Sequence, residues 1–141
     1  MKPNVAVSTI MTQNVLKLNL NDNLTKAEML YKKHKVRHLP VVQNENIVGM
    51  LSYTDLLRIS FVDAIDDDEN EVESTVYNMF SIEQVMTKNL EKITSDTTIK
   101  EAAKILSKKE FHALPVVDHD VLVGILTTTD LIKYLLEQYE K

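Results

Sequence analysis

The stretch Leu39–Asp55, LPVVQNENIVGMLSYTD, decides the fold, because it returns 75 residues later as Leu114–Asp130, LPVVDHDVLVGILTTTD. In each copy, two apolar runs rich in β-branched residues flank a short polar break, which predicts a hairpin. A Ser/Thr-x-x-Asp group closes each copy and predicts the end of a strand and the start of a helix. The chain therefore contains an internal repeat.

The repeat extends beyond this stretch: residues 10–61 align with residues 85–136 without a gap, and roughly a third of the aligned positions are identical. Each copy predicts a short strand, a helix, two strands and a final helix. The expected strands are Leu16–Leu18, Leu39–Val42 and Ile47–Leu51 in the first copy, and Lys92–Thr94, Leu114–Val117 and Leu122–Leu126 in the second. The expected helices are Leu24–His34 and Ile99–Lys109, with final helices starting near Thr54 and Thr129.

These elements predict an α+β fold of two β-α-β-β-α repeats. Residues 1–62 form the first repeat, 63–80 an acidic linker and 81–141 the second repeat. About fifty residues bury too little surface to be stable alone. We therefore expect the two repeats to pack through their sheets around a pseudo-twofold axis, as one module.

Composition removes several classes of protein. The net charge of −5 offers no broad basic surface, so we expect no nucleic-acid partner. The chain has no cysteine, which excludes disulfides, thiolate metal sites and cysteine nucleophiles and is compatible with a reducing cytoplasm. No apolar run approaches the ~20 residues of a membrane helix, and none resembles a signal peptide. We expect a soluble, cytoplasmic protein.

The acidic run Asp66–Glu71 has two readings. As an EF-hand loop counted from Asp66, it would need glycine at the sixth position and glutamate at the twelfth, where the chain has Glu71 and Tyr77. A solvated linker is the better interpretation, since runs of like charge usually stay extended in water. The histidines also lack metal-ligand spacing, so we expect no metal site.

Two LPVV strands, each followed by Gly-x-x-Ser/Thr-x-x-Asp, together with a Met-Thr pair ahead of each copy, make the chain resemble a tandem pair of cystathionine-β-synthase (CBS) domains, the Bateman module. The resemblance covers nearly the whole chain. It implies a regulatory module that binds adenosine derivatives such as AMP, ADP, ATP or S-adenosylmethionine in two clefts and commonly forms a homodimer. It implies no required cofactor. AMP or ATP is the expected ligand of the module, which would regulate an unknown partner protein.

The resemblance also implies site residues, with each cleft mixing the two copies. One cleft would use Thr97, Ala102, Arg37, His38, Met50, Ser52, Thr54 and Asp55, and the other Ala27, His112, Ile125, Thr127, Thr129 and Asp130. The adenine would meet Thr97 and Ala102, or Ala27, and the remaining residues would hold ribose and phosphate. Asp22 stands at the position of Thr97 and Ala113 at that of His38, so we rank the cleft with Thr97 and Asp55 as the better site.

The Ser/Thr-x-x-Asp groups have an alternative interpretation. Spacing alone favours a capping box that satisfies the helix start, whereas the resemblance favours a carboxylate that accepts from a ribose diol. The corresponding functions are a nucleotide-binding regulator and, alternatively, a ligand-free module for dimerisation or docking. We expect no enzyme, because the chain offers no nucleophile–base set beyond hydroxyls at helix starts and has only two glycines, too few for a phosphate loop.

Overall fold

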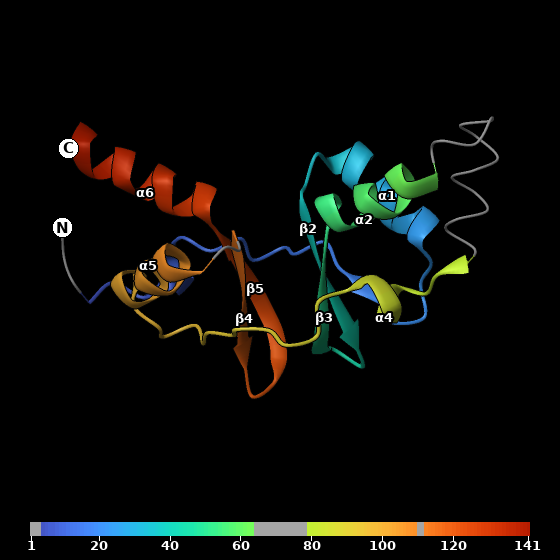
Figure 1. Cartoon of the computed structure of the whole chain (residues 1–141). Helices are drawn as coiled ribbons and strands as arrows, with labels where there is room; N and C mark the ends of the chain where they lie inside the picture. Colours follow the sequence, from blue (N-terminus) through green and yellow to red (C-terminus); the bar gives the residue numbers. More distant parts are fainter. Residues whose placement is uncertain (1–3, 64–78, 110–111) are drawn as a thin grey trace. The chain divides into compact units, whose positions relative to one another are not determined.

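The computed structural model describes residues 4–63, 79–109 and 112–141 (Figure 1). The chain divides into two compact units. Unit 1 consists of Met1–Val15, Glu45–Ile47 and Leu90–Lys141, and unit 2 consists of Leu16–Asn44 and Val48–Asn89. Each unit has its own apolar core. The prediction of an α+β fold built on two repeats is confirmed.

Unit 2 contains the first repeat. Its elements are β1 (Leu18–Asn19), α1 (Leu24–His34), β2 (His38–Gln43), β3 (Asn46–Ser52), α2 (Tyr53–Asp63) and α4 (Ile82–Val85). β1 pairs in parallel with β2, with Leu18 opposite Val41, and β2 neighbours β3. α1 has the predicted bounds, and Asn23 caps it by accepting from the Lys26 amide at 2.8 Å. Asn46, the first residue of β3, belongs to unit 1.

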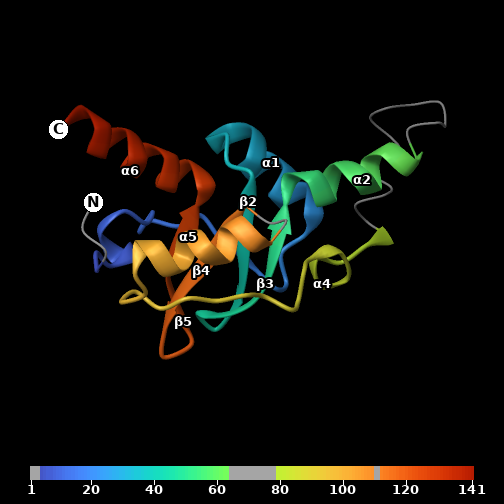
Figure 2. The same cartoon turned by 60° about the vertical axis from the view of Figure 1, so that its left-hand side comes forward.

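Unit 1 contains the second repeat. Its elements are η1 (Val7–Thr9), α5 (Ile99–Lys108), β4 (Ala113–Asp118), β5 (Val121–Thr127) and α6 (Thr128–Glu140). β4 and β5 form the predicted hairpin, from Ala113 opposite Thr127 to Asp118 opposite Val121. α5 contacts α6, and in Figures 1 and 2 the far half of α6 stands clear of the hairpin.

The two expected leading strands need correction. The first, predicted at Leu16–Leu18, is β1 at Leu18–Asn19. The strand predicted at Lys92–Thr94 is reduced to one bridge, in which Ile93 pairs in parallel with Val116. The final helices begin at Tyr53 and Thr128, as expected from starts near Thr54 and Thr129, because Ser52 and Thr127 precede the first turn. The short helix α4 was not predicted, although its Ser81-x-x-Gln84 capping box is a recognisable sequence signal.

Each repeat's leading segment packs in the compact unit of the other repeat. In unit 1, Val7 is fully buried beside residues of α5, β4 and β5, and its amide donates to the Thr97 carbonyl at 2.8 Å. In unit 2, Ile82 and Met86 join the core formed by the first repeat. The compact units thus exchange the leading segments of the two repeats, and the sequence boundaries 1–62, 63–80 and 81–141 stay a prediction.

The two glycines make room for this exchange. A Cβ atom on Gly124 would lie 2.6 Å from Met11 Sδ and 3.0 Å from the Thr12 carbonyl oxygen. A Cβ on Gly49 would collide with the side chain of Met86. Two backbone hydrogen bonds then join Thr12 to Ile125, and two join Thr87 to Met50. The repeated Met-Thr pair and the repeated glycine therefore belong to one packing contact, made once in each unit.

Candidate functional site

The strand–helix corner of the first repeat, where β3 meets α2, brings Ser52 and Asp55 into contact. Ser52 Oγ accepts from the Asp55 amide at 3.0 Å, and the Ser52 amide donates to Asp55 Oδ2 at 3.3 Å. This is a complete capping box. Asp55 Oδ1 also lies 3.9 Å from a guanidinium nitrogen of the exposed Arg58, a residue that sequence reasoning missed.

The second repeat builds the same corner where β5 meets α6. The Thr127 amide donates to Asp130 Oδ2 at 2.9 Å, and the Asp130 amide donates to Thr127 Oγ1 at 3.2 Å. The capping interpretation is therefore confirmed at both aspartates. Both carboxylates remain half-buried rather than enclosed, and the hydroxyl-bearing residues Thr54 and Thr129 are exposed on the adjoining first turns.

Backbone hydrogen bonds place one basic residue beside each corner. The Tyr53 amide donates to the Arg37 carbonyl at 2.8 Å, and the Thr128 amide donates to the His112 carbonyl at 3.0 Å. Arg37 and His112 are exposed. The structure thus holds the main chain of Arg37 beside the corner of Ser52 and Asp55, and the main chain of His112 beside the corner of Thr127 and Asp130. We call these the Asp55 half-site and the Asp130 half-site.

The remaining predicted site residues occupy different surroundings. His38 is half-buried at the start of β2, whereas Ala113, at the matching position of β4, is buried. Met50 and Ile125 are buried in the strands that lead to the two corners. Ala27 and Ala102 are fully buried in the cores of units 2 and 1, so their predicted contact with adenine stays a prediction.

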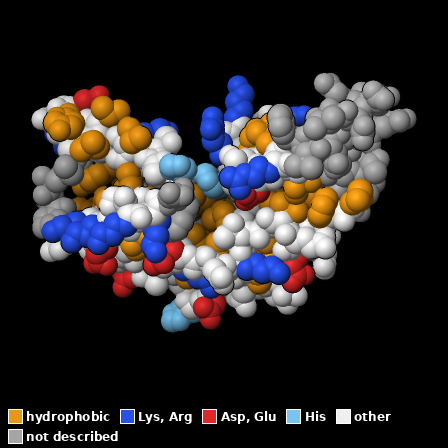
Figure 3. Space-filling view, in the orientation of Figure 1, with side chains coloured by type: hydrophobic (Ala, Val, Ile, Leu, Met, Phe, Trp, Pro, Cys, Tyr) orange, Lys and Arg blue, Asp and Glu red, His pale blue; other side chains and the backbone are white. Residues whose placement is uncertain are grey.

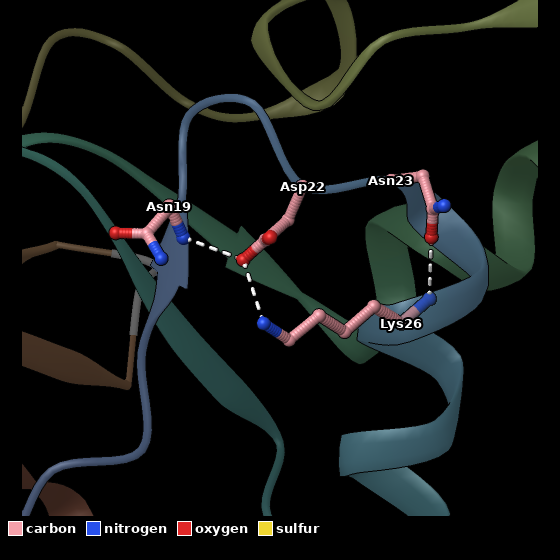
Figure 4. Close-up of polar contacts among 4 residues, drawn as sticks. All are labelled: Asn19, Asp22, Asn23 and Lys26. Atoms are coloured by element: carbon pink, nitrogen blue, oxygen red, sulfur yellow. Dashed lines mark hydrogen bonds and ion pairs between the residues drawn. The ribbon is translucent and has the colours of Figure 1, made fainter.

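Asp22 and Thr97 perform the same structural task in the two repeats. Asp22 Oδ2 accepts from the Asn19 amide at 2.8 Å (Figure 4). In the second repeat, Thr97 Oγ1 accepts from the Thr94 amide at 3.1 Å. Asp22 Oδ2 also receives a hydrogen bond from Lys26 Nζ at 3.1 Å, so a neighbouring cation offsets its charge. The substitution at position 22 therefore preserves the turn, and Lys26 is a contributor that sequence reasoning missed.

Tyr31 contacts the residues on both sides of Ser52 in the Asp55 half-site. Sequence reasoning missed it, because no motif contains it. Its buried hydroxyl donates to the Leu51 carbonyl, and its ring meets that of Tyr53 edge-on, with ring centroids 5.2 Å apart. Burial, and secondarily the negative charge of Asp55, raise the pKa of the Tyr31 hydroxyl above its ordinary value. The hydroxyl therefore stays a hydrogen-bond donor at neutral pH.

The described residues contain neither a cluster of metal-ligating side chains nor a membrane-spanning helix. No group of three or more His, Cys, Asp or Glu side chains within residues 4–63, 79–109 and 112–141 is arranged to hold a metal ion. The acidic run Asp66–Glu71 and most of the predicted linker 63–80 lie outside the described residues. Over the described part of the chain, no helix combines the length and apolar character needed to cross a membrane.

Comparison with known proteins now identifies the family. The CBS domain model matches residues 7–61 and 82–137, and the chain therefore belongs to the CBS domain family, with two copies of the domain. The protein MJ1404 of Methanocaldococcus jannaschii is 30% identical over 134 residues, which cover 93% of this chain and 32% of that protein. A CBS domain-containing protein of Dictyostelium discoideum is 27% identical over 96% of this chain and 94% of its own length.

Comparison of the fold with solved structures also finds similar proteins. The crystal structure of CBSX2 in complex with AMP superimposes with a TM-score of 0.79 at 27% sequence identity, covering 96% of this chain and 98% of that one. The chain spans less than half the length of the first four M. jannaschii proteins that it matches, between 32% and 45%.

Proposed function

We propose that the chain is a regulatory module that binds an adenosine nucleotide, of the AMP, ADP, ATP or S-adenosylmethionine class, and has no catalytic role of its own. The observation that carries this proposal is the repeated corner. In both repeats a hydroxyl and a half-buried carboxylate meet at the start of a helix, and a backbone hydrogen bond joins the first residue of that helix to the main chain of a basic residue. The similar protein CBSX2 was crystallised with AMP, which supports the choice of ligand.

The capping role of Asp55 is compatible with ribose binding. An ionised carboxylate has about four lone-pair sites on its two oxygens, and the cap uses Oδ2 alone. The half-buried carboxylate can therefore accept from a ribose diol while it caps the helix. The exposed Arg37 carries a rigid fork of donors suited to phosphate. We assign ribose to Asp55 and Asp130, and phosphate to Arg37, Ser52 and Thr54 in one half-site and to His112, Thr127 and Thr129 in the other.

The Asp55 half-site is proposed to bind more strongly than the Asp130 half-site. The guanidinium of Arg37 offers five N–H donors in a rigid fork, whereas the imidazole of His112 offers at most two. Alanine at position 113 removes the second base that His38 supplies next to Arg37. The negative charge of Asp22 weighs less than the sequence suggested, since Lys26 lies 3.1 Å from it.

Isothermal titration with AMP, ADP, ATP and S-adenosylmethionine tests the proposal, with GMP as the control for base recognition. We expect saturable binding of at least one adenosine ligand and a thermal shift that grows with ligand concentration as RT ln(1 + [L]/Kd). If none of the four ligands binds at millimolar concentration, the ligand-free docking module becomes the function to adopt.

We also propose that the module forms a homodimer through α6. This helix buries none of its residues, and it carries an apolar stripe at i, i+3, i+4 and i+7 (Figure 3). The stripe residues Ile132, Leu135, Leu136 and Tyr139 are 56%, 40%, 52% and 80% exposed. Such a stripe is typical of a helix with one buried face, and a second copy presents the same stripe.

A further inference from the structure

We propose that Tyr31 is a positioning residue of the Asp55 half-site, which gives the first repeat a preorganised corner that the second repeat lacks. The inference rests on the proposed function and deepens it. Tyr31 holds the residues on both sides of Ser52: its hydroxyl donates to the Leu51 carbonyl, and its ring packs edge-on against Tyr53.

The surrounding hydrogen bonds carry this restraint to the predicted ligand-binding groups. Ser52 is joined reciprocally to Asp55. Tyr53, the next residue, is joined through its amide to the Arg37 carbonyl at 2.8 Å. A shift at residue 51 or 53 therefore moves the hydroxyl, the carboxylate and the base together. Because Tyr31 is 3% exposed, it acts on a ligand only through these neighbours.

The second repeat provides an internal comparison. The repeat register places Leu106 opposite Tyr31 and Thr128 opposite Tyr53, so neither the hydroxyl nor the ring contact has a counterpart. Leu106 instead fills the core of unit 1 with apolar contacts. The capping box and the backbone bond to the base are nevertheless present at Thr127 and His112. The tyrosine pair is thus not needed to form the corner, and its role at the Asp55 half-site is to restrain it.

Tyr31→Phe is the direct test, because it keeps the ring and removes only the hydroxyl. Preorganisation lowers the cost of ordering a site on binding. We expect the affinity for AMP or ATP to fall about three- to tenfold, corresponding to the loss of one buried hydrogen bond. Ile82→Val is the matched control: it removes one methyl group from the same core, lowers the melting temperature comparably and should leave affinity unchanged.

A double-mutant cycle separates positioning from general stability. If Tyr31 acts through the corner, Tyr31→Phe weakens binding less in the Asp55→Ala background than in the wild type, because Asp55 is one of the groups that Tyr31 positions. Additive losses in affinity would overturn the inference, as would an unchanged affinity in folded Tyr31→Phe. If Tyr31→Phe does not fold, Tyr53→Thr takes its place, because it installs the residue that the second repeat has at this position. We expect Tyr53→Thr to weaken nucleotide binding, and an unchanged affinity would overturn the inference. Absence of binding by the wild-type protein would instead overturn the proposed function itself.

Discussion

Met11 packs against Gly124: a Cβ atom added to that glycine would lie 2.6 Å from the methionine sulfur. The contact joins the leading segment of the first repeat to β5 of the second repeat, within unit 1. Gly49 and Met86 make the equivalent contact within unit 2. The two contacts explain why both glycines of the chain fall in register with each other and with a Met-Thr pair.

Gly124→Ala and Gly49→Ala should each lower the free energy of unfolding by about 1–3 kcal/mol, because the added methyl group overpacks the methionine. Chemical denaturation measures the effect. The rescue should differ between the units. Met86→Ala removes all three atoms that a Cβ on Gly49 would contact most closely, whereas Met11→Ala leaves the Thr12 carbonyl 3.0 Å from a Cβ on Gly124. Equal rescue by the two methionine substitutions would contradict this packing.

Asp22→Thr should leave stability nearly unchanged, because Thr97 closes the equivalent turn with its hydroxyl. Asp22→Ala should cost about 0.5–2 kcal/mol, since the Asn19 amide loses its acceptor. Thr97→Ala provides the matched loss in the other repeat. Urea unfolding of the three variants is the measurement, and a loss for Asp22→Thr as large as that for Asp22→Ala would show that the charge, rather than the turn, is important.

The stability contributed by Asp118 should depend on pH on the acid side. Hydrogen bonds from the Ser95 side chain, and then from its backbone, hold the pKa of this half-buried carboxyl below its ordinary value. A lowered folded-state pKa means that the contribution is complete above the unfolded pKa of about 4 and is lost as the pH falls through the folded value. Asp118→Asn should therefore narrow the difference in melting temperature between neutral and acid pH. An unchanged difference would contradict the interaction with Ser95.

The dimer proposal predicts that Leu136→Glu yields a monomer, because it places a carboxylate in the exposed apolar stripe of α6. Lys133→Glu is the control: it puts the same group on α6 outside the stripe and should leave a dimer. Light scattering at high micromolar concentration distinguishes them. A monomeric wild-type protein would contradict the homodimer and would leave α6 as a docking face for a different protein.

Much of the fold was predictable, because local patterns decide it. The apolar spacing of Ile99, Ala102 and Leu106 and the cap at Thr98 predicted the start of α5 and placed its end one residue too late, at Lys109. The exchange of leading segments was not predictable in this way. Nothing local to Val7 or Ile82 indicates which core will bury them, and that choice depends on long-range packing.

In the candidate site, too, the local hydrogen bonds were predictable and the long-range contacts were not. The capping boxes follow from the spacing of Ser52 and Asp55, and of Thr127 and Asp130, and the structure confirms them. The role of Tyr31 could not be predicted from the sequence, because this residue lies on α1, twenty residues from the Leu51 carbonyl that it contacts. The charge partner of Asp22, Lys26, follows from i, i+4 helix spacing and could have been predicted.

The most direct measurement is calorimetric titration of the wild-type protein, Asp55→Ala and Asp130→Ala with AMP and ATP. Since both carboxylates cap helices, each variant should lose about 0.5–2 kcal/mol of stability, as should Thr98→Ala, which removes the cap of α5 outside the predicted phosphate and ribose groups. Ribose binding by Asp55 adds charge-assisted hydrogen bonds, so Asp55→Ala should weaken affinity about tenfold or more and Asp130→Ala less. Equal affinity in all three proteins, with only the melting temperatures lowered, would show that the aspartates are caps alone and would contradict the proposed site.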